Sequence, residues 1–112
     1  MIESLIGSKS REQVLVFITA RKQAYAREIS EYYNVSVSPI QDQLNKLELG
    51  GILMSRSYGK TRLYFYNTAF AFYKEIRALM EKIILFLPAG EREKLSNIRT
   101  RPRRKNKPLA KA

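Results

Sequence analysis

The chain has 112 residues, a hydrophobic content of 45% and a formal net charge of +11, which is the size and composition of one basic globular domain. It contains no cysteine and no histidine, which excludes disulfides, thiol chemistry, Cys/His zinc sites and catalysis by an imidazole. The first residues include neither a basic leader nor an apolar run long enough for a signal peptide, and no apolar run approaches the roughly 20 residues of a membrane span. We therefore expect a soluble cytoplasmic protein with no cofactor and no contact with a membrane.

The positive charge is concentrated at the C-terminal end. Seven basic residues and no acidic ones follow Ile98, which leaves a net charge of +4 for residues 1–98. A basic tail attracts nucleic acids of any sequence because it releases their counterions. Alternatively, such a tail is a solvated, disordered terminus that only aids solubility. The tail residues that we expect to contact nucleic acid nonspecifically are Arg99, Arg101, Arg103, Arg104, Lys105 and Lys107.

Two amphipathic helices are predicted in the first third of the chain. Ser8 or Ser10 can cap the first helix, which we expect to end at residues 21–23. Its apolar face consists of Val14, Leu15, Phe17 and Ile18. The second helix is expected over residues 25–33, with Ala26, Ile29 and Tyr33 directed inward and Asn34 ending it.

A third helix and a hairpin follow. The helix is expected over residues 37–49, with a cap oxygen from Ser36 or Ser38, an inward face of Ile40, Leu44 and Leu47, and a stop at residues 50–51. Two runs of β character, residues 52–57 and 62–66, flank a turn at residues 58–61.

A long fourth helix is expected over residues 69–87, capped by Asn67 or Thr68. It carries more apolar residues than one domain needs to cover its core, which favours a homodimer. The alternative is that the helix simply covers the domain and leaves some apolar side chains exposed. The residues expected to form the dimer contact are Phe72, Ile76, Leu79, Met80, Ile83 and Phe86.

The expected organisation is thus mainly α with a small β-hairpin (α+β). Residues 1–87 would form one domain, and residues 88–112 a short helical piece followed by the basic tail. Helix, tight turn, helix and basic hairpin, in this order, form the winged helix-turn-helix pattern, whose usual ligand is double-stranded DNA.

In such a fold, the second helix of the pair enters the major groove with short polar side chains. Ser38, Gln41, Asp42 and Asn45 are therefore candidates for base reading, although any solvated helix face carries such residues. The hairpin cations Arg56, Lys60 and Arg62 are candidates for contacts with the DNA backbone or minor groove, although strand edges also carry cations to prevent edge pairing.

Two other functions have less support in the residues. The aromatic run at residues 64–66 is a candidate stacking platform for single strands, but alternate residues of a strand point into the core. Acidic residues are scattered, and no phosphate loop, serine nucleophile motif or metal-ligand spacing is present, so we do not expect an enzyme.

Four segments resemble ArsR-like winged-helix proteins, in particular the small ones often encoded beside nucleotidyltransferases. Residues 5–11 (L-I-G-S-K-S-R) are similar to the leader L-F-G-S-K-T-R, and residues 25–30 (Y-A-R-E-I-S) to Y-x-R-E-I-A. Residues 43–53 (Q-L-N-K-L-E-L-G-G-I-L) resemble R-E-L-x-x-L-E-x-x-G-L-L, and residues 56–66 (R-S-Y-G-K-T-R-L-Y-F-Y) resemble R-x-x-G-x-x-x-Y-Y-x.

The resemblance spans residues 5–82 and implies a winged-helix fold, dimerisation by terminal helices and DNA binding, mostly in repression. The metal-sensing members of that group use cysteines and histidines, which this chain lacks, so we do not expect metal sensing. We thus expect a dimeric, sequence-selective DNA-binding regulator of transcription. The alternatives are a protein-interaction module that docks through the fourth helix, and a protein whose tail binds structured RNA.

Overall fold

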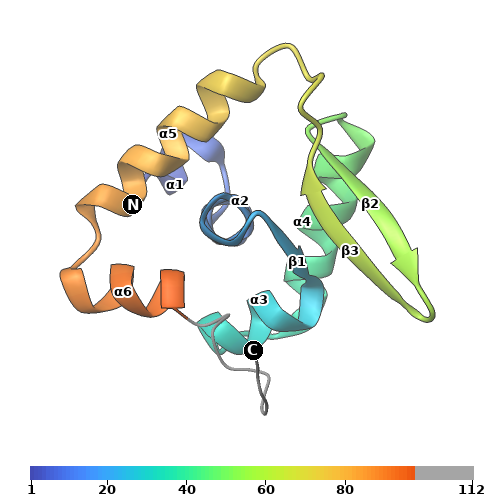
Figure 1. Ribbon diagram of the computed structural model, residues 1–112, viewed down its shortest axis with the longest axis horizontal. Helices are drawn as coiled ribbons and strands as arrows, with labels where there is room; N and C mark the ends of the chain where they lie inside the picture. The colour runs from blue at the N-terminus through green and yellow to red at the C-terminus, as the bar shows by residue number, and fades with distance from the viewer. Residues whose placement is uncertain (98–112) are drawn as a thin grey trace, which may run out of the picture.

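The computed structural model, which describes residues 1–97, has an α+β arrangement (Figure 1). This part of the chain contains six helices and one antiparallel sheet with the strand order β1-β3-β2. The elements are α1 (Glu3–Ile6), α2 (Lys9–Arg21), β1 (Gln23–Tyr25), α3 (Ala26–Tyr33), α4 (Val37–Leu49), β2 (Leu53–Tyr58), β3 (Thr61–Tyr66), α5 (Tyr73–Phe86) and α6 (Ala89–Asn97). Within these residues, no helix has both the length and the apolar content needed to cross a membrane.

Helix α2 is the centre of the core. Five consecutive side chains, from Val14 to Ile18, are buried, so the helix is covered on nearly all sides rather than along one stripe. Figure 1 shows α2 end on, with α3, α4, α5 and α6 arranged around it. The helix begins as expected, because the Ser8 side chain accepts a hydrogen bond from the Arg11 backbone N–H at 3.1 Å.

Helices α3 and α4 confirm the expected pair, and α4 has the predicted bounds. Its inward residues Ile40, Leu44 and Leu47 are all buried. Asn34, which ends α3, has φ 56° and donates its backbone N–H to the carbonyls of the last turn. Ser36 occupies the N-cap position of α4, but its side-chain oxygen does not accept the expected hydrogen bond from a backbone N–H.

Strands β2 and β3 form the expected hairpin. Gly59 has φ +61° at the first central position of the turn, where a type II′ turn requires a positive φ. The third strand, β1, was not predicted, because we expected residues 23–25 to end one helix and begin the next. Its pairing is non-local, with Ala24 opposite Tyr64. A segment of three residues is too short for its hydrophobic pattern to indicate a strand.

Helix α5 begins four residues later than expected. The Asn67 side chain donates to the Gly51 carbonyl at 2.8 Å and accepts from the Ala69 N–H at 3.1 Å. It therefore stabilises a turn after β3 and connects this turn to the loop after α4. Phe70 and Phe72 lie in the segment before the helix, with their ring centroids 5.9 Å apart. The expected helical span of residues 69–87 was therefore too long at its start.

Helix α6 packs against α2. Leu95 is 1% exposed and belongs to the same core as α2, and its carbonyl accepts a 2.8 Å hydrogen bond from Arg21 Nε. The break expected at residues 88–90 is shorter, because α6 already begins at Ala89 and includes Gly90. The expected division at residue 87 thus separates two helices, but it does not separate two cores.

We predict that Lys22→Gly stabilises the protein by about 0.5–1 kcal/mol, because Lys22 ends α2 with φ 78°, a left-handed conformation that costs less for glycine. Urea unfolding monitored by circular dichroism measures the change. Lys22→Ala removes the same charge but keeps a Cβ, and it should give no comparable gain. A lower free energy of unfolding for Lys22→Gly than for the wild type would contradict this explanation.

We also predict that stability falls as pH rises from 10 to 12, in part through Tyr66. Burial raises the pKa of Tyr66 from 10.0 to about 12 and outweighs the opposite effect of the 2.8 Å hydrogen bond to Thr19. The folded state therefore holds this proton at a pH where the unfolded state releases it. Free energies of unfolding measured across this range should decline less steeply for Tyr66→Phe. An equal slope would show that other groups, such as Tyr33, whose pKa burial also raises, account for the decline.

Candidate functional site

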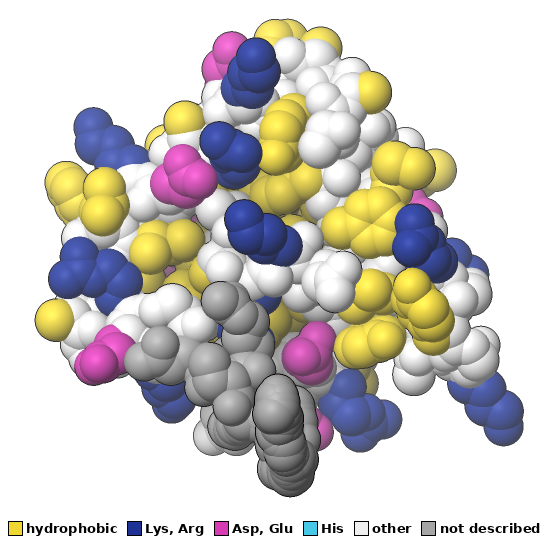
Figure 2. All heavy atoms as spheres, viewed as in Figure 1, with side chains coloured by type: hydrophobic (Ala, Val, Ile, Leu, Met, Phe, Trp, Pro, Cys, Tyr) yellow, Lys and Arg dark blue, Asp and Glu magenta, His cyan; other side chains and the backbone are white. Residues whose placement is uncertain are grey.

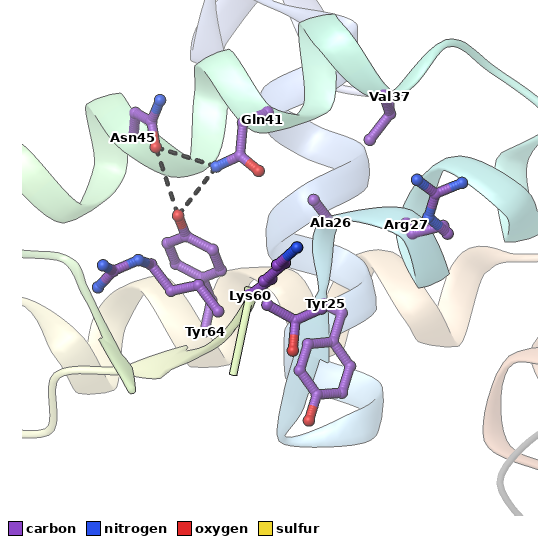
Figure 3. Close-up of a pocket in the computed structure, with 10 residues that line it drawn as sticks. Tyr25, Ala26, Arg27, Val37, Gln41, Asn45, Lys60 and Tyr64 are labelled. Atoms are coloured by element: carbon purple, nitrogen blue, oxygen red, sulfur yellow. Dashed lines mark hydrogen bonds between the residues drawn. The ribbon is translucent and has the colours of Figure 1, made fainter. Parts of the chain in front are cut away.

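An open cleft lies between the start of α3, the exposed side of α4 and the hairpin β2–β3 (Figure 3). Its volume is about 410 Å³. Three segments that are distant in the sequence meet there. The lining residues are Tyr25, Ala26, Arg27, Val37, Gln41, Asn45, Lys60, Thr61, Arg62 and Tyr64.

The cleft is positively charged. Arg27 comes from α3, Lys60 from the tip of the hairpin and Arg62 from β3, and none of the ten lining residues is acidic. Three cations around one concave surface raise the local concentration of anions. The cleft can therefore hold a phosphate-bearing ligand beside the amide groups of α4.

Those amides form a closed set of hydrogen bonds with a tyrosine. Gln41 Nε2 lies 3.0 Å from Asn45 Oδ1 and 2.9 Å from the hydroxyl of Tyr64, and this hydroxyl lies 3.3 Å from Asn45 Oδ1. Figure 3 shows the Tyr64 hydroxyl pointing from β3 towards both amides. We call these three residues the amide–tyrosine triad. The triad fixes the position of two of the four side chains that the sequence suggested for base reading.

The other two candidates on α4 lie outside the cleft. Ser38 is exposed near the start of the helix. The Asp42 carboxylate lies 3.3 Å from Lys46 Nζ, one turn further along, and both side chains are more than half exposed. An exposed ion pair of this kind contributes little to stability, but it partly neutralises the one acidic candidate.

The hairpin cations divide between the two faces of the sheet. Lys60 and Arg62 line the cleft, and Arg62 Nη1 donates to Ser55 Oγ at 2.9 Å, which in turn donates to Glu48 Oε2 at 2.6 Å. Arg56 is opposite Leu63 in the register and lies over the Phe65 ring at 5.6 Å, on the other face. The three cations expected to act together therefore do not share one surface.

Sequence reasoning proposed only four of the ten lining residues, and the ones it missed include Tyr25, Arg27 and Tyr64. Tyr25 and Arg27 belong to the first turn of α3 and its cap, and only the fold brings them beside the hairpin. Tyr64 was considered only as part of a stacking platform. Its ring is 1% exposed, so it offers no face for a base to stack on. The sequence signal that could have indicated Tyr64 is the alternation of side chains along the strand, because it turns Tyr64 towards α4.

The six residues expected to form a dimer contact have different environments. Met80 and Ile83 are buried in the protein's own core, and Ile76 packs against that core, because α5 covers α2. These residues are therefore not free for a partner, whereas Phe72, Leu79 and Phe86 are exposed. A second exposed apolar surface, with Met54 and Tyr58, lies on the outer face of the hairpin, where Figure 2 shows hydrophobic side chains gathered at the right.

The six basic tail residues, Arg99 to Lys107, lie outside the described residues. In the part that the structure describes, no group of three or more His, Cys, Asp or Glu side chains is arranged to hold a metal ion. The polar groups that characterise the cleft are therefore its three cations, the two amides and the Tyr64 hydroxyl, and not metal ligands.

The chain matches no family model, no curated protein and no solved structure. The ArsR-like resemblance therefore stays a prediction. The function has to be argued from the cleft and from the exposed surfaces of the chain itself.

Proposed function

We propose that this protein is a winged helix-turn-helix protein that binds double-stranded DNA sequence-selectively and represses transcription, without sensing a metal. The observation that carries the proposal is that α4 and the hairpin border one cleft, in which Arg27, Lys60 and Arg62 surround the amides of Gln41 and Asn45. In this proposal α4 is the recognition helix and the hairpin is the wing.

The division of chemistry within the cleft supports this proposal. Cations on α3 and on the wing suit phosphates, which position a protein on the duplex without reading its sequence. Amides on the exposed side of a 13-residue helix suit base edges in the major groove, which is wide enough to admit a helix. In this proposal Ser38 and Asp42, which lie on α4 outside the cleft, make additional contacts along the same groove. The basic tail would add affinity that does not depend on sequence.

A homodimer through the exposed side of α5 is part of the proposal. Phe72 and Phe86 are 63% and 69% exposed, which is unusual for large aromatic side chains at both ends of one helix. A symmetric dimer would present two recognition helices to half-sites about one duplex turn apart. The same exposed residues support a second candidate function, in which the protein docks on a protein partner and only the tail binds nucleic acid.

We predict that Lys60→Glu and Arg27→Glu weaken binding to all duplexes alike and lower the salt slope by at least about one. Fluorescence anisotropy across a salt series measures both quantities, with a duplex from the region upstream of the gene and a scrambled duplex. Lys74→Glu is the matched control, because it makes the same charge change on α5, outside the cleft. Unchanged affinity for both cleft variants would exclude the cleft from the interface.

A chain that ends at Ile98 separates the two candidate functions in the same assay. If the domain reads sequence, the truncated chain keeps its preference for one duplex, and only its salt slope falls. If truncation abolishes binding and the full chain had no preference, the docking function is favoured.

We further predict that Phe86→Glu converts a dimer into a monomer, because it places a charge in the proposed apolar contact. Light scattering coupled to gel filtration measures the mass. Leu49→Glu is the control, since Leu49 is 90% exposed at the end of α4 and outside the proposed contact. A wild-type monomer, or a dimer that survives Phe86→Glu, would contradict the proposed dimer through α5.

A further inference from the structure

Each hydrogen-bond donor and acceptor inside the amide–tyrosine triad can be assigned to a partner. An amide NH₂ has two donors, and an amide oxygen accepts two hydrogen bonds. Both donors of Gln41 Nε2 are used, one by Asn45 Oδ1 and one by the Tyr64 hydroxyl. The Tyr64 hydroxyl donates its own proton to Asn45 Oδ1, which thereby accepts two hydrogen bonds.

Only two groups of the amides are left over. These are the carbonyl oxygen of Gln41, an acceptor, and the NH₂ of Asn45, a pair of donors. If both amides were turned around, the triad would close equally well and the two roles would be exchanged. In either arrangement each amide presents one kind of group, and never a donor and an acceptor together.

Tyr64 is the fixed member of this set. Its side chain is 1% exposed, and its backbone lies in the central strand, opposite Ala24 of β1 and Ser55 of β2. Gln41, by contrast, is half-buried and Asn45 is exposed, and no hydrogen bond to any residue of the described chain outside the triad holds their side-chain amides. Because Tyr64 is held in the sheet, its hydroxyl restricts the side-chain conformations of Gln41 and Asn45.

We propose that Tyr64 is a positioning residue that sets which base edges Gln41 and Asn45 can read. This inference rests on the proposed function. Free Asn and Gln side chains pair bidentately with adenine, through its N6 amino group and N7, and that pairing needs a donor and an acceptor on one amide. The triad denies this pairing to both residues.

The triad favours other bases instead. An amide that presents its NH₂ group matches the N7 and O6 acceptors of guanine, and an amide that presents its carbonyl oxygen matches an exposed amino group, as on cytosine N4. In the first arrangement these are Asn45 and Gln41, and with both amides turned around they exchange roles. Asn45 and Gln41 are one helical turn apart, so they would meet neighbouring base pairs. The preferred site thus has a guanine, rather than an adenine, opposite the amide that presents its NH₂ group, which is Asn45 in the first arrangement.

The first test uses the free, full-length protein. Tyr64→Phe keeps the buried ring and removes only the hydroxyl, so we predict that the side-chain NH₂ signals of Gln41 and Asn45 shift in ¹⁵N-resolved NMR spectra. Tyr66→Phe is the matched control, because it removes a second hydroxyl from the same strand, one that is bonded to Thr19 instead. If Tyr64→Phe leaves both NH₂ signals in place, the triad does not hold these side chains and the inference is overturned.

The second test is selection of binding sites from a randomised duplex pool, with Asn45→Ala used to identify the base pair that Asn45 contacts. We predict that Tyr64→Phe gains adenine at that pair and loses about fivefold or more of its discrimination for the wild-type base. Its salt slope should be unchanged, and Tyr66→Phe should keep the wild-type preference. Asn45→Asp, an exposed change that does not involve the core, should move the preference from guanine to cytosine in the first arrangement, and Gln41→Glu should do so at its own base pair in the second.

The outcomes separate the two proposals. If the wild type selects a site and Tyr64→Phe selects the same site, base reading stands and the role of Tyr64 is overturned. If the wild type selects no site, sequence-selective binding fails, and the inference fails with it.

Discussion

The burial of α2 on nearly all sides is the constraint on which the rest of the structure depends. A helix whose residues Val14 to Ile18 are all buried must be surrounded, and burying each such side chain stabilises the fold by roughly 1.5–3 kcal/mol. The surrounding elements therefore each contribute an apolar side, including α6 through Leu95. This arrangement fixes α4 beside the hairpin, and it places the cleft on the outside of a rigid core.

Polar contacts then fix how α4 sits against the sheet. The buried side chain of Gln43 accepts a 2.8 Å hydrogen bond from Arg11 Nε, which joins α4 to α2. Near the C-terminal end of the helix, Glu48 joins α4 to the hairpin through Ser55. Tyr64 joins β3 to the outer side of α4 through Gln41 and Asn45. A site built on such connected elements is positioned more precisely than one on a free loop.

The two exposed apolar surfaces follow from the same geometry. Helix α5 covers α2 with Met80 and Ile83, so its remaining apolar residues, such as Phe86, face solvent. The sheet packs one face against α4, and its outer face exposes Met54 and Tyr58. Surfaces of this kind in a small chain are characteristic of contacts with another molecule, which is why we relate α5 to a dimer.

The sequence by itself determined what depends on local periodicity and local stops. It predicted the bounds of α4 and the inward side of that helix, and it came within a residue or two of the hairpin, because a 3.6-residue period, a glycine pair and alternation all act over neighbouring residues. Only the tertiary structure decided β1, the late start of α5 and the division of apolar residues between core and surface. It also decided which cations meet and which hydroxyl holds Gln41 and Asn45. Each of these depends on residues that are far apart in the chain, such as Ala24 and Tyr64, and no local pattern records such a contact.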